Sequence, residues 1–204
     1  MRKLFLASSF SDVAKLFPQF AKEDCKGKTV TFISTASLVE KVNFYVKSAQ
    51  KAFNKIGIIV DEFDITNASK EAIENKISDN DYIYISGGNT FYLLQELKKT
   101  GADKIITNQI ENGKIFIGES AGSMILSKNI EYAKIMDDST KAEELENFDS
   151  LGVVDFYPVP HHTNFPFKKA VEKIIKEYST TLDLRPISNK QVITVVEDEV
   201  VIVS

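Results

Sequence analysis

The stretch KIFIGESAGSM, residues 114–124, decides the fold of this chain and begins with a run of apolar residues. Lys114–Gly118 is typical of a strand that is buried on both faces of a sheet. Gly118–Gly122 fits the pattern G-x-S-x-G, in which a serine stands at a sharp turn from a strand into a helix. Small residues let the chain reverse there, and the following helix directs free N–H groups toward negative charge. The stretch therefore predicts an α/β sheet with the hydroxyl group of Ser120 above its edge.

Segments typical of strands and of helices alternate along the chain up to this stretch. Strands are predicted at Lys3–Ala7, Thr29–Ser34, Ile58–Ile65, Tyr82–Ser86 and Lys114–Gly118. The spacing of apolar residues predicts helices at Asp12–Lys22, Leu38–Ile56, Ala68–Ile77, Phe91–Lys98 and Lys104–Glu111. These β-α repeats with apolar strands indicate an α/β fold, a three-layer αβα sandwich around a mostly parallel, doubly wound sheet.

The last third of the chain departs from this alternation. Val153–Val159 is predicted to be extended and Phe167–Tyr178 to be helical. Gln191–Val203 is typical of a β-hairpin that turns at Glu197-Asp198. No internal repeat, linker or low-complexity segment divides the sequence, so we expect one domain over residues 1–204.

The composition excludes several classes of protein. Of the 204 residues, 43% are hydrophobic and 26% are charged, as in an ordinary globular domain. The apolar runs are too short for a bilayer-spanning helix, and the start lacks the apolar core of a secretory signal, so a cytoplasmic location is expected. The single cysteine and two adjacent histidines argue against a disulfide and against a metal site. The 25 basic and 29 acidic residues give a net charge of −4, which argues against nucleic acid as a partner.

Two adjacent histidines are the candidates for the base that a serine nucleophile needs. His161 and His162 lie in the segment Pro158–Asn164, directly after a segment predicted to be extended. Loops at the carboxyl edge of an open α/β sheet are where such folds bind ligands. We therefore expect a histidine of this pair to act on Ser120, and the pair leaves open whether the other is a bystander.

The carboxylate that would orient this histidine is predicted to lie between the serine and the histidines in the sequence. The candidates are Glu131, Asp137, Asp138, Asp149 and Asp155. Asp137 and Asp138 follow Glu131–Met136, which is predicted to be extended, and so are expected at the same sheet edge as the serine. The acidic segment Asp137–Ser150 is interpreted as a solvated loop or surface helix. The alternative is a lid, or a segment that supplies the active-site acid.

A second glycine-containing loop, Ser86–Thr90, follows the fourth predicted strand. Glycine permits the close backbone approach that an oxyanion hole requires, and this loop can lie beside the serine turn in a parallel sheet. The alternative is a phosphate-binding turn. The first predicted β-α turn has no G-x-G-x-x-G, and no G-x-x-x-x-G-K-[ST] occurs anywhere, which disfavours that alternative.

Three motifs together resemble the peptidase E, or aspartyl dipeptidase, family of serine peptidases, with cyanophycinases as more distant relatives. They are Ser86–Phe91, Gly118–Ser123 and Pro160–Asn164, and their order and spacing match the family across roughly residues 80–165. The resemblance implies the flavodoxin-like fold of class I glutamine amidotransferases, with serine in place of their cysteine. It also implies hydrolysis of short peptides without a cofactor. The expected partner is a short peptide and no membrane, and the chain is expected to be a monomer or a homodimer.

The resemblance implies roles for individual residues of these motifs. The nucleophile falls on Ser120 and its histidine on His161. The acid falls on Asp137, with Asp138 as the alternative. The oxyanion hole falls on Gly87, Gly88 and the N–H group of Ala121. The possible substrate-binding residues are Asn89, Thr90, Glu119, His162, Thr163 and Asn164.

One feature of the aspartyl dipeptidases is missing from this sequence. They carry a Gly- and Arg-containing segment after the histidine motif, which helps to recognise an N-terminal aspartate. Here Asn164 runs into Phe165–Ala170, where Lys168 or Lys169 supplies a point charge but no bidentate clamp. We therefore expect a serine dipeptidase or exopeptidase without strict Asp-X specificity. The alternatives are an esterase or small-amide hydrolase with the same serine, and a catalytically idle binding protein with an amidotransferase-like fold.

Overall fold

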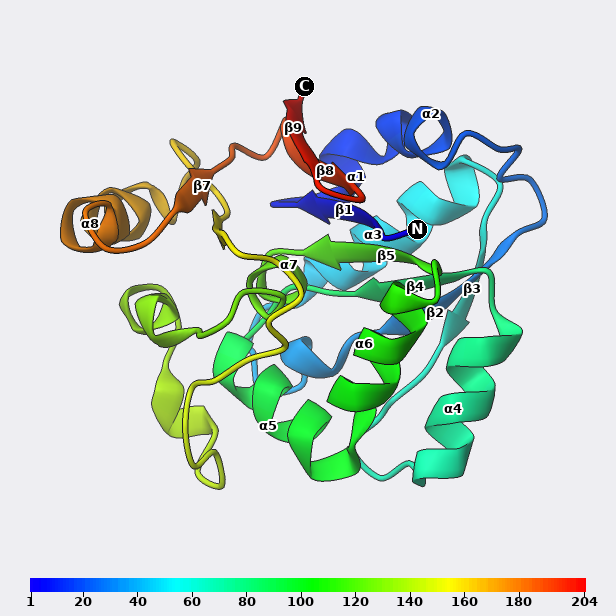
Figure 1. Ribbon diagram of the computed structural model, residues 1–204, viewed down its shortest axis with the longest axis horizontal. Coiled ribbons are helices and arrows are strands. Elements are labelled where there is room, and N and C mark those ends of the chain that lie inside the picture. Colours follow the sequence, from blue (N-terminus) through cyan, green and yellow to red (C-terminus); the bar gives the residue numbers. More distant parts are fainter.

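The central sheet has seven strands, in the order β3-β2-β4-β5-β1-β8-β9, in the computed structural model of residues 1–204 (Figure 1). Their bounds are β1 Lys3–Ala7, β2 Thr29–Ile33, β3 Ile59–Glu62, β4 Tyr82–Ile85, β5 Ile115–Glu119, β8 Val192–Val196 and β9 Glu199–Val203. The pairs among β1 to β5 are all parallel. β8 pairs antiparallel with β1, and β9 antiparallel with β8. The predicted mostly parallel sheet and the C-terminal hairpin are therefore confirmed.

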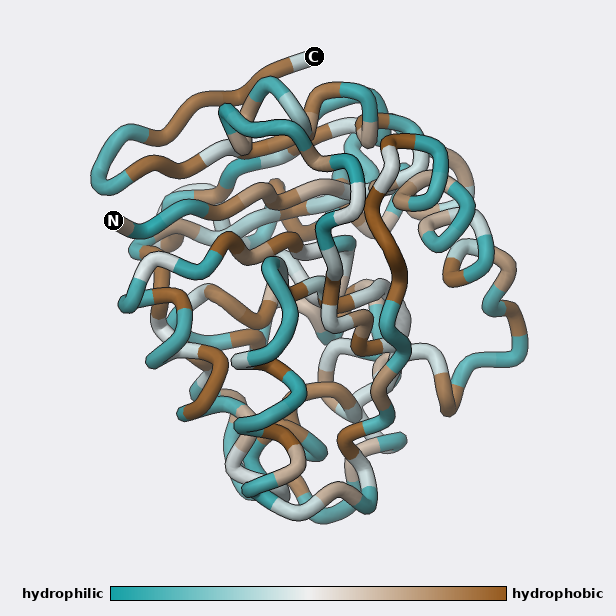
Figure 2. The backbone as a smooth tube through the Cα atoms, turned by 90° about the vertical axis from the view of Figure 1, so that its right-hand side faces the viewer, coloured by the Kyte–Doolittle hydropathy of each residue, from teal (hydrophilic) through white to brown (hydrophobic).

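Helices cover both faces of this sheet and complete the three layers. One face carries α1 (Phe10–Val13), α2 (Phe17–Ala21) and α3 (Phe44–Lys55). The other carries α4 (Lys70–Asp79), α5 (Thr90–Thr100), α6 (Ala102–Glu111) and α7 (Ala121–Met124). Neighbouring residues of a strand point to opposite faces, so Leu4 packs into one core and Phe5 into the other. Hydrophobic stretches of the tube in Figure 2 accordingly run along the strands.

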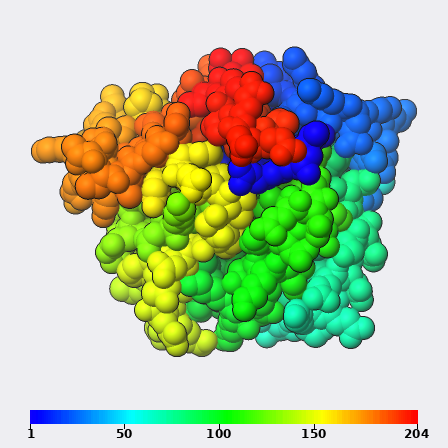
Figure 3. Space-filling view, in the orientation of Figure 1, coloured from blue at the N-terminus to red at the C-terminus, as the bar shows by residue number.

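A smaller substructure stands beside the carboxyl ends of the parallel strands (Figure 1). β6 (Tyr157–Val159) and β7 (Leu184–Pro186) pair in parallel, and α8 (Lys168–Tyr178) connects them. A third hydrophobic cluster, which includes Tyr132 and Ile174, joins α8 to the segment that follows α7. In Figure 3 the C-terminal hairpin lies against the N-terminal strand, in line with the pairing of β8 with β1. No helix of the protein is long and apolar enough to span a membrane.

The predicted helices near the N-terminus are present but shorter or divided. The prediction at Asp12–Lys22 corresponds to parts of α1 and α2, with the 3-10 turn η1 (Ala14–Leu16) between them. Pro18 lies in the first turn of α2. Backbone N–H groups there have no partner within the helix, so proline costs the helix no hydrogen bond. α3 begins six residues after the predicted start at Leu38, because the 3-10 turn η2 (Thr35–Ser37) and a loop precede it.

The extended segments predicted in the last third are shorter or absent. Glu131–Met136 is not extended, because Glu131–Ile135 forms the 3-10 helix η3. Its Tyr132 side chain is buried in the cluster that includes residues of α8, and a short apolar run does not distinguish a strand from a helical turn. Of the predicted segment Val153–Val159, only Tyr157–Val159 forms a strand.

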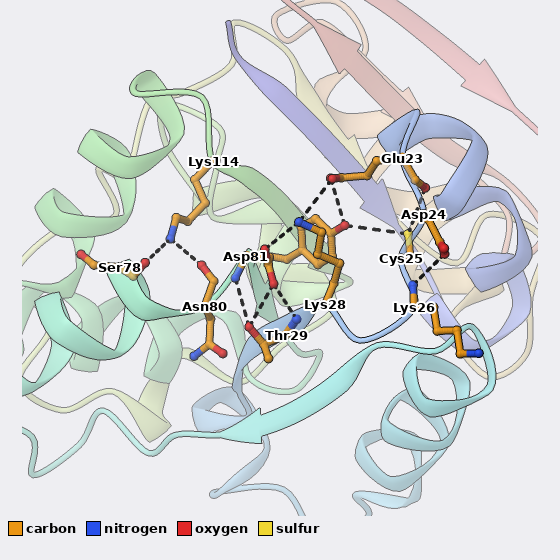
Figure 4. A network of polar contacts seen from close by, with 11 residues as sticks. Glu23, Asp24, Cys25, Lys26, Lys28, Thr29, Ser78, Asn80, Asp81 and Lys114 are labelled. Carbon is orange, nitrogen blue, oxygen red and sulfur yellow. Dashed lines mark hydrogen bonds and ion pairs between the residues drawn. The ribbon is translucent and has the colours of Figure 1, made fainter.

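A polar network lies at the amino end of the parallel strands (Figure 4). Lys114, just before β5, donates hydrogen bonds to the carbonyl oxygens of Ile77 (2.5 Å), Ser78 (3.0 Å) and Asn80 (2.6 Å). These carbonyl groups belong to the end of α4, where the last turn leaves acceptors without an intrahelical partner. The network therefore joins α4 to the start of β5, at the end of the sheet remote from Ser120.

Candidate active site

Ser120 stands at the turn between β5 and α7, at the carboxyl edge of the sheet. Its backbone angles are φ +49° and ψ −108°, a conformation that residues other than glycine rarely adopt. A Cβ atom on Gly118 would lie 2.6 Å from the carbonyl oxygen of Gly122, and one on Gly122 would overlap the carbonyl oxygen of Ile85. The backbone N–H of Ser120 donates to the carbonyl oxygen of Ala7 at 2.9 Å. The G-x-S-x-G stretch thus has the strand-to-helix geometry that the motif predicts.

A histidine side chain lies within hydrogen-bonding distance of this serine. The Oγ atom of Ser120 is 2.9 Å from Nε2 of His161. The backbone N–H of His161 donates to Oγ of Ser8 at 3.0 Å, and the ring stacks on Phe167 with centroids 4.7 Å apart. His162 makes no side-chain hydrogen bond, and its backbone N–H donates to Ile187 at 2.9 Å. The structure therefore brings His161, and not His162, to the serine.

The other nitrogen of the His161 ring faces an amide side chain. Its Nδ1 atom lies 2.8 Å from Oδ1 of Asn189, in the loop between β7 and β8. The backbone N–H of Asn189 donates to Oδ1 of Asn164 at 2.9 Å, which holds this loop against the histidine segment. An amide oxygen only accepts hydrogen bonds, so Nδ1 carries the proton and Nε2 is left as the acceptor for the Ser120 hydroxyl group.

Burial sets the protonation state of His161. Removal of the ring from water lowers its pKa, and the hydrogen bond with Asn189 opposes this effect only in part. No carboxylate forms a hydrogen bond with the ring, whose two nitrogens face Ser120 and Asn189. His161 is therefore neutral near pH 7, which is the form that accepts a proton from a serine hydroxyl group.

The prediction that Asp137 or Asp138 orients the histidine is wrong. The carboxylate of Asp137 accepts hydrogen bonds from the hydroxyl group of Thr90 and from its backbone N–H, the latter at 2.9 Å. Asp138 accepts from the N–H of Thr140 at 3.0 Å, in the 3-10 turn η4 (Ser139–Lys141). Both acids follow the 3-10 helix η3 and not a strand. They therefore lie at the start of α5 and not beside the histidine. The other candidates are paired elsewhere: Glu131 with Lys134, Asp149 with Asn129, and Asp155 with Lys128.

The start of α5 is held in place by polar side chains, including Asn89 and Thr90, which the resemblance implies as possible substrate-binding residues. Oδ1 of Asn89 accepts from the backbone N–H of Tyr92 at 3.0 Å, which caps the helix. Its Nδ2 atom donates to the carbonyl oxygen of Asp138 at 3.0 Å. Burial raises the pKa of Asp137 to about 6, although its two hydrogen bonds from Thr90 lower it. The loop directly before α5, which contains Gly87 and Gly88 and is called the glycine loop below, is therefore held by Asn89, Thr90 and Asp137.

The loop between β4 and α5 presents backbone N–H groups beside the serine. A Cβ atom on Gly87 would lie 3.2 Å from the Cβ atom of Ser120, so the two residues are in close contact. Gly88 has φ +135°, and a Cβ atom there would overlap the carbonyl oxygen of Ala36. The N–H groups of Gly87, Gly88 and Ala121 donate to no acceptor within the protein. Free donors beside a nucleophile suit the negatively charged oxygen of a tetrahedral intermediate.

Asn189 lies outside the interval between serine and histidine in which the sequence predicts the orienting residue. A usable signal is its place in the chain, in a polar loop just before the predicted hairpin. The pairing of β8 with β1 brings that loop to the sheet edge where Ser8 holds His161. Thr163, at φ +66°, and Asn164 continue the histidine loop, and Glu119 is buried behind Ser120.

An αβα sandwich in which a serine turn, a histidine and free N–H groups meet at the carboxyl edge of the sheet defines a hydrolase. The chain belongs to peptidase family S51, since the model of that family matches residues 4–203. The protein is therefore a peptidase.

Proteins similar to this chain cover almost all of it. It is 54% identical over 195 residues to an uncharacterised peptidase of Pasteurella multocida, which covers 96% of this chain and 94% of that protein. It is 51% identical over 201 residues to an uncharacterised peptidase of Listeria innocua, with 98% and 96% covered. The solved structure of a candidate peptidase E from Listeria monocytogenes has a TM-score of 0.94 at 50% identity. That match covers 99% of this chain and 98% of the other.

Proposed function

We propose that this peptidase is a serine-type exopeptidase that hydrolyses short peptides such as dipeptides, without a cofactor. The observation that carries the proposal is the 2.9 Å separation between the hydroxyl oxygen of Ser120 and Nε2 of His161. Family membership gives peptide hydrolysis, and this pair supplies a nucleophile and a base for it.

The proposed reaction has two stages. In the first, Oγ of Ser120 attacks the carbonyl carbon of the peptide bond while Nε2 of His161 takes the hydroxyl proton. The carbonyl oxygen becomes negative and receives hydrogen bonds from the free N–H groups of Gly88 and Ala121. The C–N bond then breaks, His161 gives its proton to the leaving amine, and an ester on Ser120 remains. In the second stage, a water molecule attacks the carbonyl carbon of this ester while Nε2 of His161 takes a proton from the water. The bond to Oγ of Ser120 then breaks, His161 returns the proton to Oγ, and the acid is released.

The contacts of the two arginines favour a substrate other than a strict Asp-X dipeptide. The chain has two arginines, and both are engaged elsewhere. Arg2 donates to the carbonyl oxygens of Val153 and Glu197, and Arg185 pairs with Asp183 at 2.8 Å. A carboxylate side chain of a substrate would therefore find no guanidinium group for bidentate binding. The proposed substrates are short peptides without a strict requirement for an N-terminal aspartate.

The first experiment is turnover of a dipeptide library by mass spectrometry, with Ser120→Ala as the reference. The wild type is expected to cleave members of the library, and the variant none of them. Cleavage at comparable rates by both proteins would overturn the proposal. If neither protein cleaves a peptide but the wild type cleaves esters, the enzyme acts on another acyl group.

A further inference from the structure

Glu119 is a buried acid next to the nucleophile Ser120. The chemistry proposed for Ser120 and His161 gives Glu119 no role. It is the last residue of β5, directly before Ser120, and it is only 4% exposed. Its Oε2 atom accepts two hydrogen bonds of 2.9 Å, from the backbone N–H of Phe10 and from the hydroxyl group of Tyr84. Carboxyl groups are almost never buried to this degree without a cationic partner, and Glu119 has none.

These two hydrogen bonds tie three neighbouring strands together at the edge where the site lies. Phe10 opens α1 directly after β1, and Tyr84 belongs to β4. β1 and β4 flank β5 on its two sides. The carboxyl group of Glu119 therefore bridges the ends of all three strands next to the turn that holds Ser120. A change in either bond acts on this turn, because residues 119 and 120 share a peptide bond.

The second oxygen of the carboxyl group faces the glycine loop. Oε1 of Glu119 accepts no hydrogen bond from the protein, and it would lie 3.7 Å from a Cβ atom on Gly87. The Cβ atom of Ser120 would lie 3.2 Å from the same point. A charge on Glu119 is therefore close to the loop whose N–H groups are free to stabilise an oxyanion.

The groups that surround Glu119 are acidic or phenolic. They are Asp12 on α1, Tyr84 on β4 and Tyr45 on α3, and no basic side chain acts on the carboxyl group. Burial raises the pKa of Glu119 to about 7, while the hydrogen bonds from Phe10 and Tyr84 act in the opposite direction. Its charge therefore changes within the pH range in which a neutral His161 can act as a base.

We propose that Glu119 is a positioning residue of this site, and that its neutral form is the one that supports acyl transfer at Ser120. The inference rests on the serine chemistry proposed above. In both charge states Oε2 holds the strand ends together through Phe10 and Tyr84. An ionised Glu119 places a buried negative charge beside the glycine loop, where it opposes the charge that develops on the carbonyl oxygen. A neutral carboxyl group removes this opposition.

Glu119→Gln tests the inference, because glutamine keeps the shape and an acceptor oxygen but cannot ionise. The measurement is the rate at which an alkyl fluorophosphonate labels Ser120, since this probe carries no titratable group. From about pH 7 to about pH 9 the wild-type rate is expected to fall roughly tenfold or more. E119Q is expected to lose this decline. Glu96→Gln, at a buried carboxyl group of α5, is the control and is expected to follow the wild type.

Tyr84→Phe separates the ionisation of Glu119 from a purely structural effect. The hydroxyl group of Tyr84 lowers the pKa of Glu119, so its removal is expected to move the decline to higher pH. A role in structure alone would lower the rate by the same factor at every pH. Thermal melting shows whether E119Q folds. If E119Q does not fold, Tyr84→Phe tests the inference in its place, because it removes only one hydroxyl group.

Failure of this inference differs from failure of the proposed function. If the wild type is labelled at Ser120 but E119Q declines with pH as the wild type does, the role of Glu119 is wrong and the serine chemistry stands. If the wild type is not labelled and cleaves no more peptide than Ser120→Ala, the serine chemistry is wrong. The role of Glu119 is then overturned with it.

Discussion

Oδ1 of Asn189 lies 2.8 Å from Nδ1 of His161, so a neutral amide orients the ring that faces the serine. A carboxylate at this place would also stabilise the positive charge that the ring carries after it takes the proton of Ser120. An amide fixes the tautomer equally well but contributes less to that charge. Burial lowers the pKa of His161, and the hydrogen bond with the amide opposes this only in part, so the ring is a weaker base than one paired with a carboxylate.

Replacing Asn189 should separate orientation from charge. Asn189→Ala is expected to lower kcat about 10- to 100-fold, because the ring loses its fixed tautomer. Asn189→Asp adds a negative charge at Nδ1, which raises the pKa of His161 and moves the acid limb of the kcat/KM profile to higher pH. The profile is measured on the best dipeptide of the library. Asn108→Ala, at an exposed site on α6, is the control, and equal rates for N189A and this control would contradict the assignment.

The two histidines should differ sharply when each is removed. His161→Ala removes the group at 2.9 Å from Oγ of Ser120 and is expected to lower kcat by about 10³-fold or more. His162→Ala is expected to stay within about threefold of the wild type, because its side chain makes no hydrogen bond. Steady-state kinetics on the same dipeptide compare the two variants. Equal losses would mean that His162 also acts in the reaction.

The serine turn and the glycine loop can be predicted from the sequence because their geometry is local. Gly118, Ser120 and Gly122 lie within five residues, and the turn leaves no room for a Cβ atom at either glycine. The apolar runs of the parallel strands predict the sheet because they alternate along the chain with segments of helical spacing, as in folds with helices on both faces of the sheet. Local patterns of this kind specify their own structure.

Asn189 and Asp137 show where such prediction ends. The contact between Asn189 and His161 joins residues 28 positions apart, and it depends on how the hairpin returns along β1. The position of Asp137 depends on η3, whose sequence Glu131–Ile135 is compatible with both a strand and a helical turn. Packing of Tyr132 in the third cluster favours the helical turn. Both residues are placed by tertiary packing, which a single sequence does not encode locally.

Asp137 should make the protein less stable as the pH rises. Burial raises its pKa to about 6, so the folded chain binds this proton more tightly than the unfolded chain does. The resulting stability is present at low pH and is lost as the pH rises from about 4 to about 6. Asp137→Asn keeps an acceptor for Thr90 and is expected to be more stable than the wild type by about 1–3 kcal/mol at pH 7. Near pH 4 the two proteins should be alike.

Urea unfolding at both pH values checks this prediction, with Asp138→Asn as the matched control. Hydrogen bonds from Thr140 lower the pKa of Asp138, so its contribution to stability has the opposite sign. Asp138→Asn is therefore expected to lose a little stability near pH 7 and none at low pH. The same pH dependence in both variants would contradict the explanation by burial.

Lys114 should contribute to stability and not to catalysis, because it lies at the amino end of the sheet (Figure 4). Lys114→Met would leave the carbonyl groups of Ile77, Ser78 and Asn80 without their donor. The expected loss is about 2–4 kcal/mol of unfolding free energy, with kcat per folded molecule unchanged. Urea unfolding gives the loss, and Lys104→Met, on the exposed side of α6, is the control. A loss no larger than that of the control would contradict the role of the network.

Gly88 should be intolerant of a side chain for a reason that goes beyond its backbone angle. Alanine at a positive φ costs roughly 1 kcal/mol of unfolding free energy when its Cβ atom meets no other atom. Gly101→Ala measures this cost alone, because a Cβ atom on Gly101 meets nothing within 4 Å. Gly88→Ala adds an overlap with the carbonyl oxygen of Ala36. That carbonyl group accepts the N–H of Asn89 at 2.8 Å, so the overlap displaces the start of α5 together with the glycine loop. Gly88→Ala is therefore expected to lower kcat about 100-fold even where it folds, whereas Gly101→Ala keeps its activity. The kcat values of the two variants are compared at the same concentration of folded protein. Full activity of G88A would show that the loop takes no part in the reaction.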